Sequence, residues 1–190
     1  MSEPSWGKWG TWEDAESFVG KTVGVTRSPD AVELGAIRRW LEPKEFDCAL
    51  HTDLSAAKAA GYRDIIAPNT MAFTYGIGPY WAPEDGLSKP GYEPRQISIP
   101  VIFDVPAPCK LSFATSVEIE FFDPIYVGDQ ITCTSKLISL LKKELRVGAG
   151  AFFKQEDTYT NQDGGVVAIA HLDIFRFNPP EGKRVHHESR

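Results

Sequence analysis

Two side chains that can exchange protons lie four residues apart in one short stretch of the chain. Asp47 carries a carboxylate and His51 an imidazole, and both fall between two segments with helical periodicity. An acid and an imidazole that meet around one water can divide the roles of general acid and general base, which is what hydration of a double bond requires. The alternative is that Asp47 is a solvated loop acid and that His51 packs against the helix containing Trp40.

A second candidate feature is the stretch 65–71, which leads into an apolar helical segment. Free N–H groups at Asn69 and Thr70, together with the positive end of the helix dipole, would stabilise a carbonyl oxygen that gains negative charge, as in a thioester enolate. Ordinary helix capping by the same two residues is the alternative, and capping and oxyanion binding are compatible. Asn69 is therefore a candidate oxyanion donor through its backbone, and Thr70 a candidate substrate contact.

The composition argues against several classes of protein. The 190 residues include 20 Lys and Arg against 26 Asp and Glu, a net charge of -6, so nucleic acid is not an expected partner. No apolar run reaches the roughly 20 residues of a membrane helix, and the first residues do not resemble a secretory signal. We therefore expect a cytoplasmic protein with no membrane partner. The motifs GxGxxG, GxxxxGK and GxSxG are absent, which argues against dinucleotide and nucleoside triphosphate enzymes.

The cysteines give no indication of a metal site. Cys48, Cys109 and Cys133 are odd in number, widely spaced and never in a CxxC pair. Such spacing indicates neither a disulfide framework nor a thiolate zinc site, so reduced core thiols and no bound metal are expected.

The N-terminal half predicts three helices, over residues 28–42, 53–60 and 69–77. Ser28 suits the N-cap of the first helix, which should end before Pro43 because proline disfavours helix at the preceding residue. Asp53 suits the cap of the second helix and Gly61 its end. The third helix is apolar nearly all round, so we expect it to be buried.

Beyond residue 95 the apolar period changes, and four strands are expected, over 112–122, 130–141, 145–160 and 166–177. Residues 142–143 are expected to turn one hairpin and residues 161–165 the next. Helices followed by antiparallel strands indicate an α+β domain whose sheet wraps a central helix. We expect one domain over residues 1–178, with residues 1–27 as an irregular Trp-rich extension packed on it and residues 179–190 as a polar tail.

Six motifs occur in order along the chain: GAIRRW (35–40), LHTD (50–53), AAGY (59–62), IAPNT (66–70), FFDPIYVGD (121–129) and YTNQDG (159–164). Together they resemble the MaoC-like hot-dog dehydratases over roughly residues 15–178, most closely the branch with an N-terminal MaoC dehydratase domain. The resemblance implies a hot-dog fold, in which a curved antiparallel sheet wraps a central helix and two units pair edge to edge into a double hot dog. It also implies a coenzyme A or acyl-carrier thioester as substrate, no separate cofactor, and hydration of a trans-2-enoyl thioester to an (R)-3-hydroxyacyl thioester.

The chain departs from the family at its catalytic motif. Catalytic members carry Gly-Asp-x-Asn-Pro-Leu-His, and alignment on His51 places Phe46 at the Asp, so that Asp47 stands one residue late. A carboxylate must come within hydrogen-bond reach of the water that it orients, so a small displacement is costly. Known heteromers of this family pair one complete chain with a second that shapes the acyl pocket, and they serve mycolic acid elongation and steroid side-chain degradation.

Three hypotheses follow. The leading one is a subunit of an enoyl-CoA hydratase, a hydro-lyase, that works in a heteromer with a second, complete MaoC-like chain on fatty acyl or steroid side-chain substrates. The second is a self-sufficient homodimeric hydratase that uses Asp47 and His51. The third is a non-catalytic acyl-CoA binding protein or a thioesterase, since the hot-dog fold hosts both.

Further residues are candidates for ligand binding by their type. The aromatic stretch after Thr70 offers candidate contacts to the acyl group, namely Phe73, Tyr75 and Trp81. Cations suited to the phosphates of coenzyme A occur at Arg38, Arg39, Lys58 and Arg63. The aromatic residues could equally be core, and the cations could simply be solvated.

Overall fold

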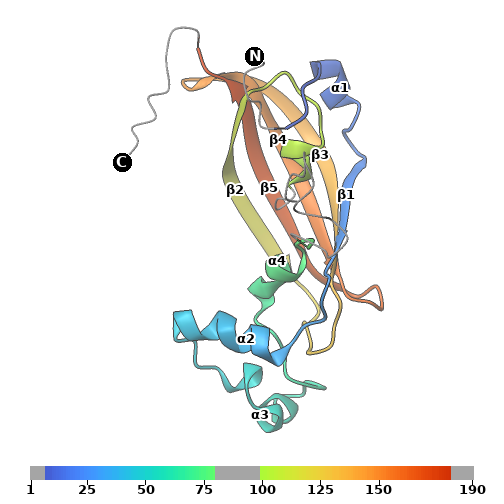
Figure 1. The fold of residues 1–190 in the computed structure, drawn as a ribbon, viewed down its shortest axis with the longest axis vertical. Coiled ribbons are helices and arrows are strands. Elements are labelled where there is room, and N and C mark those ends of the chain that lie inside the picture. The colour runs from blue at the N-terminus through green and yellow to red at the C-terminus, as the bar shows by residue number, and fades with distance from the viewer. Residues whose placement is uncertain (1–6, 80–98, 181–190) are drawn as a thin grey trace, which may run out of the picture.

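The computed structural model describes residues 7–79 and 99–180. Its centre is a five-stranded antiparallel sheet with the strand order β1-β3-β4-β5-β2 (Figure 1). The strands are β1 (Thr22–Arg27), β2 (Leu111–Phe121), β3 (Thr132–Leu145), β4 (Gly148–Thr160) and β5 (Val166–Asn178). The α-helices are α1 (Trp12–Glu16), α2 (Leu34–Leu41), α3 (Leu54–Ala59), α4 (Ala72–Tyr75) and α5 (Pro100–Phe103), and single 3-10 turns span Glu42–Lys44, Ala49–His51 and Asn69–Met71. Helices α2 and α3 lie beyond one end of the sheet, and α1 lies near the other (Figure 1).

The three long strands β3, β4 and β5 form a meander, as the alternation predicted. Its second turn is the expected one at residues 161–165, where Oδ1 of Asn161 accepts the N–H groups of Asp163 and Gly165. The prediction of the first turn at residues 142–143 is wrong. Strand β3 continues to Leu145, with Lys142 opposite Ala151, and the turn follows Leu145. The exposed Lys142 and Lys143 interrupt the apolar pattern but keep the backbone pairing with β4.

Strand β2 forms one edge of the sheet, and within the described ranges its partner is β5. The alternation in 112–122 predicted one apolar and one wet face, but the apolar face is itself largely exposed. Val117 is 53% exposed, Phe121 38% and the following Phe122 49%. Within the described residues, β2 thus has one unpaired edge, and some of its apolar side chains are exposed on the face of the sheet.

Residues 7–27 are more regular than predicted. Residues Trp12–Glu16 form α1, whose N-cap Thr11 and third residue Asp14 make a reciprocal capping box. Residues Thr22–Arg27 form β1, which pairs antiparallel with β3. The expectation of an irregular extension is therefore wrong, because β1 is defined by pairing with a distant strand and not by a local pattern.

The first predicted helix starts later than expected. Helix α2 begins after Glu33, not at Ser28, whose N–H donates to the carbonyl of Ile131 and whose hydroxyl donates to the carbonyl of Asp30. Ser28 therefore ends the strand pairing of β1 instead of capping a helix. Helix α3 is as predicted, since the Asp53 carboxylate accepts from the N–H of Ser55 at 2.7 Å.

The third predicted helix is short. A 3-10 turn at Asn69–Met71 leads into α4, which ends at Tyr75 and not at Ile77. Gly76 follows, and a Cβ at this position would lie 2.3 Å from the ring of Tyr159, so only glycine permits so close an approach of the helix end to β4. Met71, Ala72 and Tyr75 are buried, as the apolar pattern predicted.

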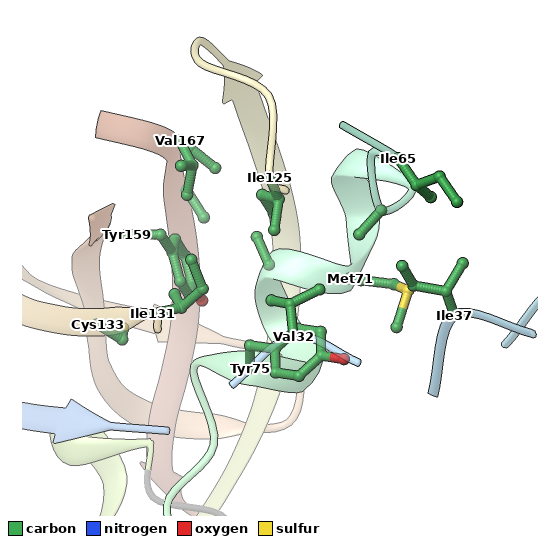
Figure 2. Close-up of a cluster of buried hydrophobic side chains, with 14 of the residues drawn as sticks. Val32, Ile37, Ile65, Met71, Tyr75, Ile125, Ile131, Cys133, Tyr159 and Val167 are labelled. Atoms are coloured by element: carbon green, nitrogen blue, oxygen red, sulfur yellow. The ribbon is translucent and has the colours of Figure 1, made fainter. Parts of the chain in front are cut away.

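Two hydrophobic clusters fill the interior. The first joins α2, α4 and the segments around them to one end of the sheet, and Figure 2 shows its members, among them Val32, Ile37, Met71, Ile125, Ile131 and Tyr159. The second joins α1 and α5 to the other end through Val101, Leu137, Phe153 and Ile174. The first cluster therefore anchors the segments that carry the candidate site.

Two further expectations concern the cysteines and the membrane. Cys109 and Cys133 are buried as expected, whereas Cys48 is only half-buried in its loop. Across the described residues, no helix has both the length and the apolar character needed to cross a membrane.

Candidate functional site

One pocket contains His51, Asn69 and Thr70 together. Its volume is about 370 Å³, and it lies between the end of α2, the turns around residues 46–51 and 68–70, and the segment after β2. Its lining residues are Trp40, Phe46, His51, Tyr62, Ile66, Pro68, Asn69, Thr70, Phe122 and Pro124. Most of the lining side chains are apolar or aromatic, but polar atoms make up nearly half of the pocket surface.

The imidazole of His51 is held in one orientation. The side chain is 8% exposed, and its Nδ1 lies 2.7 Å from the carbonyl oxygen of Ile66. Because a carbonyl can only accept, Nδ1 donates, and Nε2 of the neutral ring is left as an acceptor. The backbone N–H of His51 donates to the carbonyl of Cys48, which fixes the turn that carries the ring.

Phe46 stands beside His51, and the described residues that line the pocket include no carboxylate. The ring centroids of Phe46 and His51 are 5.7 Å apart. The preceding Glu45 has φ 47°, a left-handed conformation that ends the 3-10 turn Glu42–Lys44 and turns the chain towards the pocket. Asp47 is exposed and is not among the lining residues. The structure therefore brings His51 together with Phe46 and not with Asp47.

Asn69 and Thr70 begin the 3-10 turn that precedes α4. Both residues are exposed and line the pocket, and Pro68 before them is buried. The first N–H groups of a helix have no carbonyl partner within it, so these two backbone amides are available to a ligand oxygen. They remain the candidate oxyanion donors at the wall of the His51 pocket.

Two of the three predicted aromatic contacts, Phe73 and Tyr75, belong to or pack against the first hydrophobic cluster. Phe73 lies with its ring centroid 5.6 Å from that of Tyr159, and the hydroxyl of Tyr75 accepts from the N–H of Glu33 at 3.3 Å. Burial raises the pKa of Tyr75. Tyr75 lines a separate pocket of about 390 Å³ between the segments 28–36 and 74–79. Trp81 lies outside the described residues.

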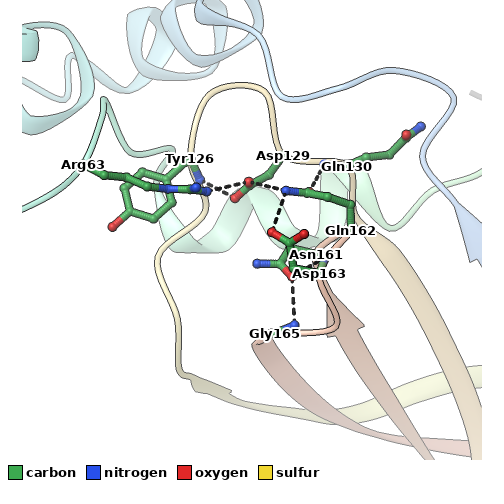
Figure 3. Close-up of polar contacts among 8 residues, drawn as sticks. All are labelled: Arg63, Tyr126, Asp129, Gln130, Asn161, Gln162, Asp163 and Gly165. Carbon is green, nitrogen blue, oxygen red and sulfur yellow. Dashed lines mark hydrogen bonds and ion pairs between the residues drawn. The ribbon is translucent and has the colours of Figure 1, made fainter.

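The predicted cations lie outside the His51 pocket. Arg38 and Arg39 are exposed on α2, where Arg38 pairs with Glu42, and Lys58 is exposed on α3. Arg63 pairs with Asp129 at 3.0 Å and lies over the ring of Tyr126 (Figure 3). All three residues line a polar hollow of about 270 Å³. Among the residues described, no cluster of His, Cys, Asp or Glu could hold a metal ion.

Several lining residues were not identified from the sequence. Phe122 and Pro124 follow the edge strand β2 and line the pocket. The nearby bridge between Tyr126 and Ile66 holds their segment beside residues that are distant in sequence. Local patterns carry no signal for such a contact. The signal for Phe46 was present, because the family motif aligned on His51 places this residue at the carboxylate position.

Comparison with known proteins agrees with this architecture. A relative from Thermomonospora curvata, named as a probable enoyl-CoA hydratase alpha subunit, is 28% identical over 179 residues, or 86% of this chain and 51% of the relative. The chain thus spans about half the length of this curated relative.

Two solved structures share the fold. The ChsH1-ChsH2 complex from Mycobacterium tuberculosis matches with a TM-score of 0.63 and 22% identity, covering 88% of this chain and 89% of the other. A MaoC-like dehydratase from Rhodospirillum rubrum matches with a TM-score of 0.55 and 18% identity, covering 83% and 92%. The sheet and helices described above are thus those of a hot-dog fold. Residues 17–170 match the family described as FAS1-like, dehydratase domain region, and the chain belongs to that family.

Proposed function

We propose that this chain is a subunit of an enoyl-CoA hydratase that converts a trans-2-enoyl-CoA into an (R)-3-hydroxyacyl-CoA. In this proposal it contributes to the acyl pocket beside a second hot-dog chain, and that partner carries the complete acid/base pair. The observation that carries the proposal is the pairing of His51 with Phe46 in a pocket whose described lining has no carboxylate.

The chemistry explains why this observation matters. Addition of water to an enoyl thioester needs one group to take a proton from water and one to deliver a proton to carbon, both within hydrogen-bond reach. His51 provides one such group, with Nε2 as its acceptor, and Phe46 provides none. An apolar ring beside the imidazole suits contact with an acyl chain better than orientation of a water. The pocket is therefore proposed to bind the thioester without hydrating it.

The edge of the sheet supports a partner at this position. An uncovered strand edge is a template for pairing with another chain, and natural proteins usually cover it. On β2 this edge carries the exposed Val117 and Phe121, and the adjoining Phe122 lines the His51 pocket. A hot-dog unit paired along β2 would therefore lie beside the pocket and could share an acyl group with it. The names of the relatives, an alpha subunit and a two-component complex, are in keeping with this arrangement.

The test is a hydration assay on a panel of trans-2-enoyl-CoA thioesters with fatty acyl and steroid side-chain acyl groups. The protein is assayed alone and after co-expression with a MaoC-like chain that has the intact Asp/His motif, and the native mass is recorded each time. We expect activity only in the mixed complex. That activity should survive His51→Gln here and be lost when the partner's motif histidine is replaced.

Other outcomes would overturn the proposal. Hydration by this chain alone, abolished by Asp47→Ala, would make it a self-sufficient homodimeric hydratase. Release of free thiol without a 3-hydroxyacyl product would make it a thioesterase. Binding of acyl-CoA with no turnover in either preparation would make it a binding protein.

A further inference from the structure

A buried carboxylate lines the polar hollow that also contains Arg63 and Tyr126. The side chain of Asp129 is 2% exposed, and its Oδ1 accepts from the guanidinium of Arg63 at 3.0 Å and from the side-chain amide of Gln162 at 3.2 Å (Figure 3). Its Oδ2 accepts from the N–H of Tyr126 at 2.8 Å. One carboxylate thus joins the segment after α3, its own turn and the turn between β4 and β5. A buried charge is tolerated when it is fully hydrogen-bonded in this way.

The turn that Asp129 closes is also paired with the segment that builds the pocket. The N–H of Ala67 donates to the carbonyl of Ile125 at 2.7 Å, and that of Val127 donates to the carbonyl of Ile65 at 3.2 Å. Between these two bonds, Ile66 and Tyr126 form an antiparallel bridge. The segment 125–129 therefore pairs with the backbone of residues 65–67 and fixes its position.

That backbone in turn holds the polar groups of the pocket. The carbonyl of Ile66 accepts from Nδ1 of His51, and its N–H donates to the carbonyl of Leu50 at 3.3 Å. The same segment continues through Pro68 to the amides of Asn69 and Thr70. A shift of Ile66 would move the imidazole and these amides together.

We propose that Asp129 is a positioning residue of the His51 pocket, acting through Tyr126 and Ile66 on the ring of His51. It touches no ligand. It sets the geometry of the pocket by accepting from three donors, one of which belongs to Tyr126, the residue that pairs with Ile66. The consequence for ligand binding rests on the proposed function, whereas the consequence for the His51 ring does not.

The experiment uses Asp129→Asn, which keeps the size of the side chain. An amide offers one acceptor oxygen and one NH₂ group, so at least one of the three donors would face another donor. Asp123→Asn is the matched control, because Asp123 is an exposed carboxylate close to Gly165 in the turn that also carries Gln162. Folding of each variant is checked by circular dichroism and thermal unfolding.

The first readout is the pair of ¹⁵N chemical shifts of the His51 ring in the ligand-free protein, assigned by comparison with His51→Gln. The native protein and Asp123→Asn should show separate shifts for a protonated Nδ1 and an unprotonated Nε2. In Asp129→Asn the two shifts should move towards each other, because the ring loses its fixed hydrogen bond and samples both tautomers. A role in overall stability alone would leave the shifts of the folded variant unchanged.

The second readout is the affinity for crotonyl-CoA. We expect Asp129→Asn to weaken binding by about tenfold, which corresponds to the loss of a typical hydrogen bond to the ligand. In the mixed complex KM should rise and kcat should stay nearly constant. Unchanged ring shifts in folded Asp129→Asn would overturn the proposal.

Two further results keep this test distinct from that of the function. Altered ring shifts in a protein whose native form does not bind crotonyl-CoA would support the positioning role and count against the proposed function. If Asp129→Asn does not fold, Asp129→Glu keeps the charge but lengthens the side chain, so the carboxylate can no longer accept from the N–H of Tyr126 in the same geometry. The ring shifts of ligand-free Asp129→Glu should then converge, and native shifts in the folded variant would overturn the proposal.

Discussion

The ring centroids of Phe46 and His51 lie 5.7 Å apart. At the position of Phe46, the resemblance to catalytic relatives places a carboxylate. The imidazole itself is oriented by the carbonyl of Ile66. In the proposed function the carboxylate is the group that this chain lacks, and a single substitution would add one.

Phe46→Asp should therefore introduce hydration activity into this chain. The new carboxylate would replace the ring that lines the pocket beside His51, and a positioned general acid or base contributes about 10²–10⁴-fold to rate. The measurement is hydration of crotonyl-CoA by the purified variant, with Phe46→Leu as a control that removes the ring without adding a carboxylate. An inactive, folded Phe46→Asp that still binds crotonyl-CoA would contradict the prediction.

The buried thiols should be unreactive in the native protein. Burial raises the pKa of Cys109 to about 11 and that of Cys133 to about 12, the latter also through the nearby Asp157 carboxylate. At about pH 8 both remain protonated, and the thiol form is a poor nucleophile. Ellman's reagent should titrate Cys48 alone in the folded protein and all three thiols in denaturant. Rapid labelling of folded Cys48→Ser would show the prediction to be wrong.

Asp157 should make the stability of the protein fall as pH rises. Burial raises the pKa of this carboxyl, and donors from Ser135 and Gln155 offset only part of the effect. Because its pKa is raised in the folded state, folding favours the protonated carboxyl. The stability that this group contributes is complete below the ordinary pKa of Asp, and it is lost as pH rises through the raised pKa.

Asp157→Asn tests this dependence. Both donors bind Oδ1, which an asparagine retains, so the substitution removes the charge and keeps the two hydrogen bonds. The free energy of unfolding of the variant in urea should increasingly exceed that of the native protein as pH rises above the ordinary pKa of Asp. Parallel curves for the two proteins across this range would refute the assignment.

Assembly with a partner should depend on the edge of β2. Val117→Glu places a charge on this exposed edge, so it should weaken the complex while leaving the unfolding of the isolated chain nearly unchanged. Leu141→Glu is the matched control, because Leu141 is 61% exposed on β3, away from that edge. The native masses of the two variants show which one no longer assembles. Loss of assembly in Leu141→Glu alone would place the interface elsewhere.

The parts of the fold that the sequence predicted are those set by local chemistry. The turn at Asn161 and the helix capped by Asp53 each satisfy their own hydrogen bonds within a few residues. Strand β1 was missed because it pairs with a strand far along the chain. Ser28 was misassigned because its N–H pairs with Ile131 instead of starting a helix.

The candidate site divides in the same way. His51, Asn69 and Thr70 could be selected by residue type and motif, and the structure places all three at one pocket. The separation of Asp47 from that pocket depends on how the loop turns after Glu45. The contribution of Asp129 depends on contacts with Arg63 and Gln162 across the fold, for which no spacing rule exists.

The strand order has a consequence for how the chain acquires its shape during synthesis. Strands β3, β4 and β5 are linked by tight turns, so they can zip together from neighbouring segments. The loop with His51 leaves the ribosome long before Tyr126, the residue opposite Ile66, has been made. Chains grow from the N-terminus, so this loop must wait unpaired until later segments arrive. All the residues that line the pocket precede β3, so the pocket can be completed before the three long strands of the sheet have been translated.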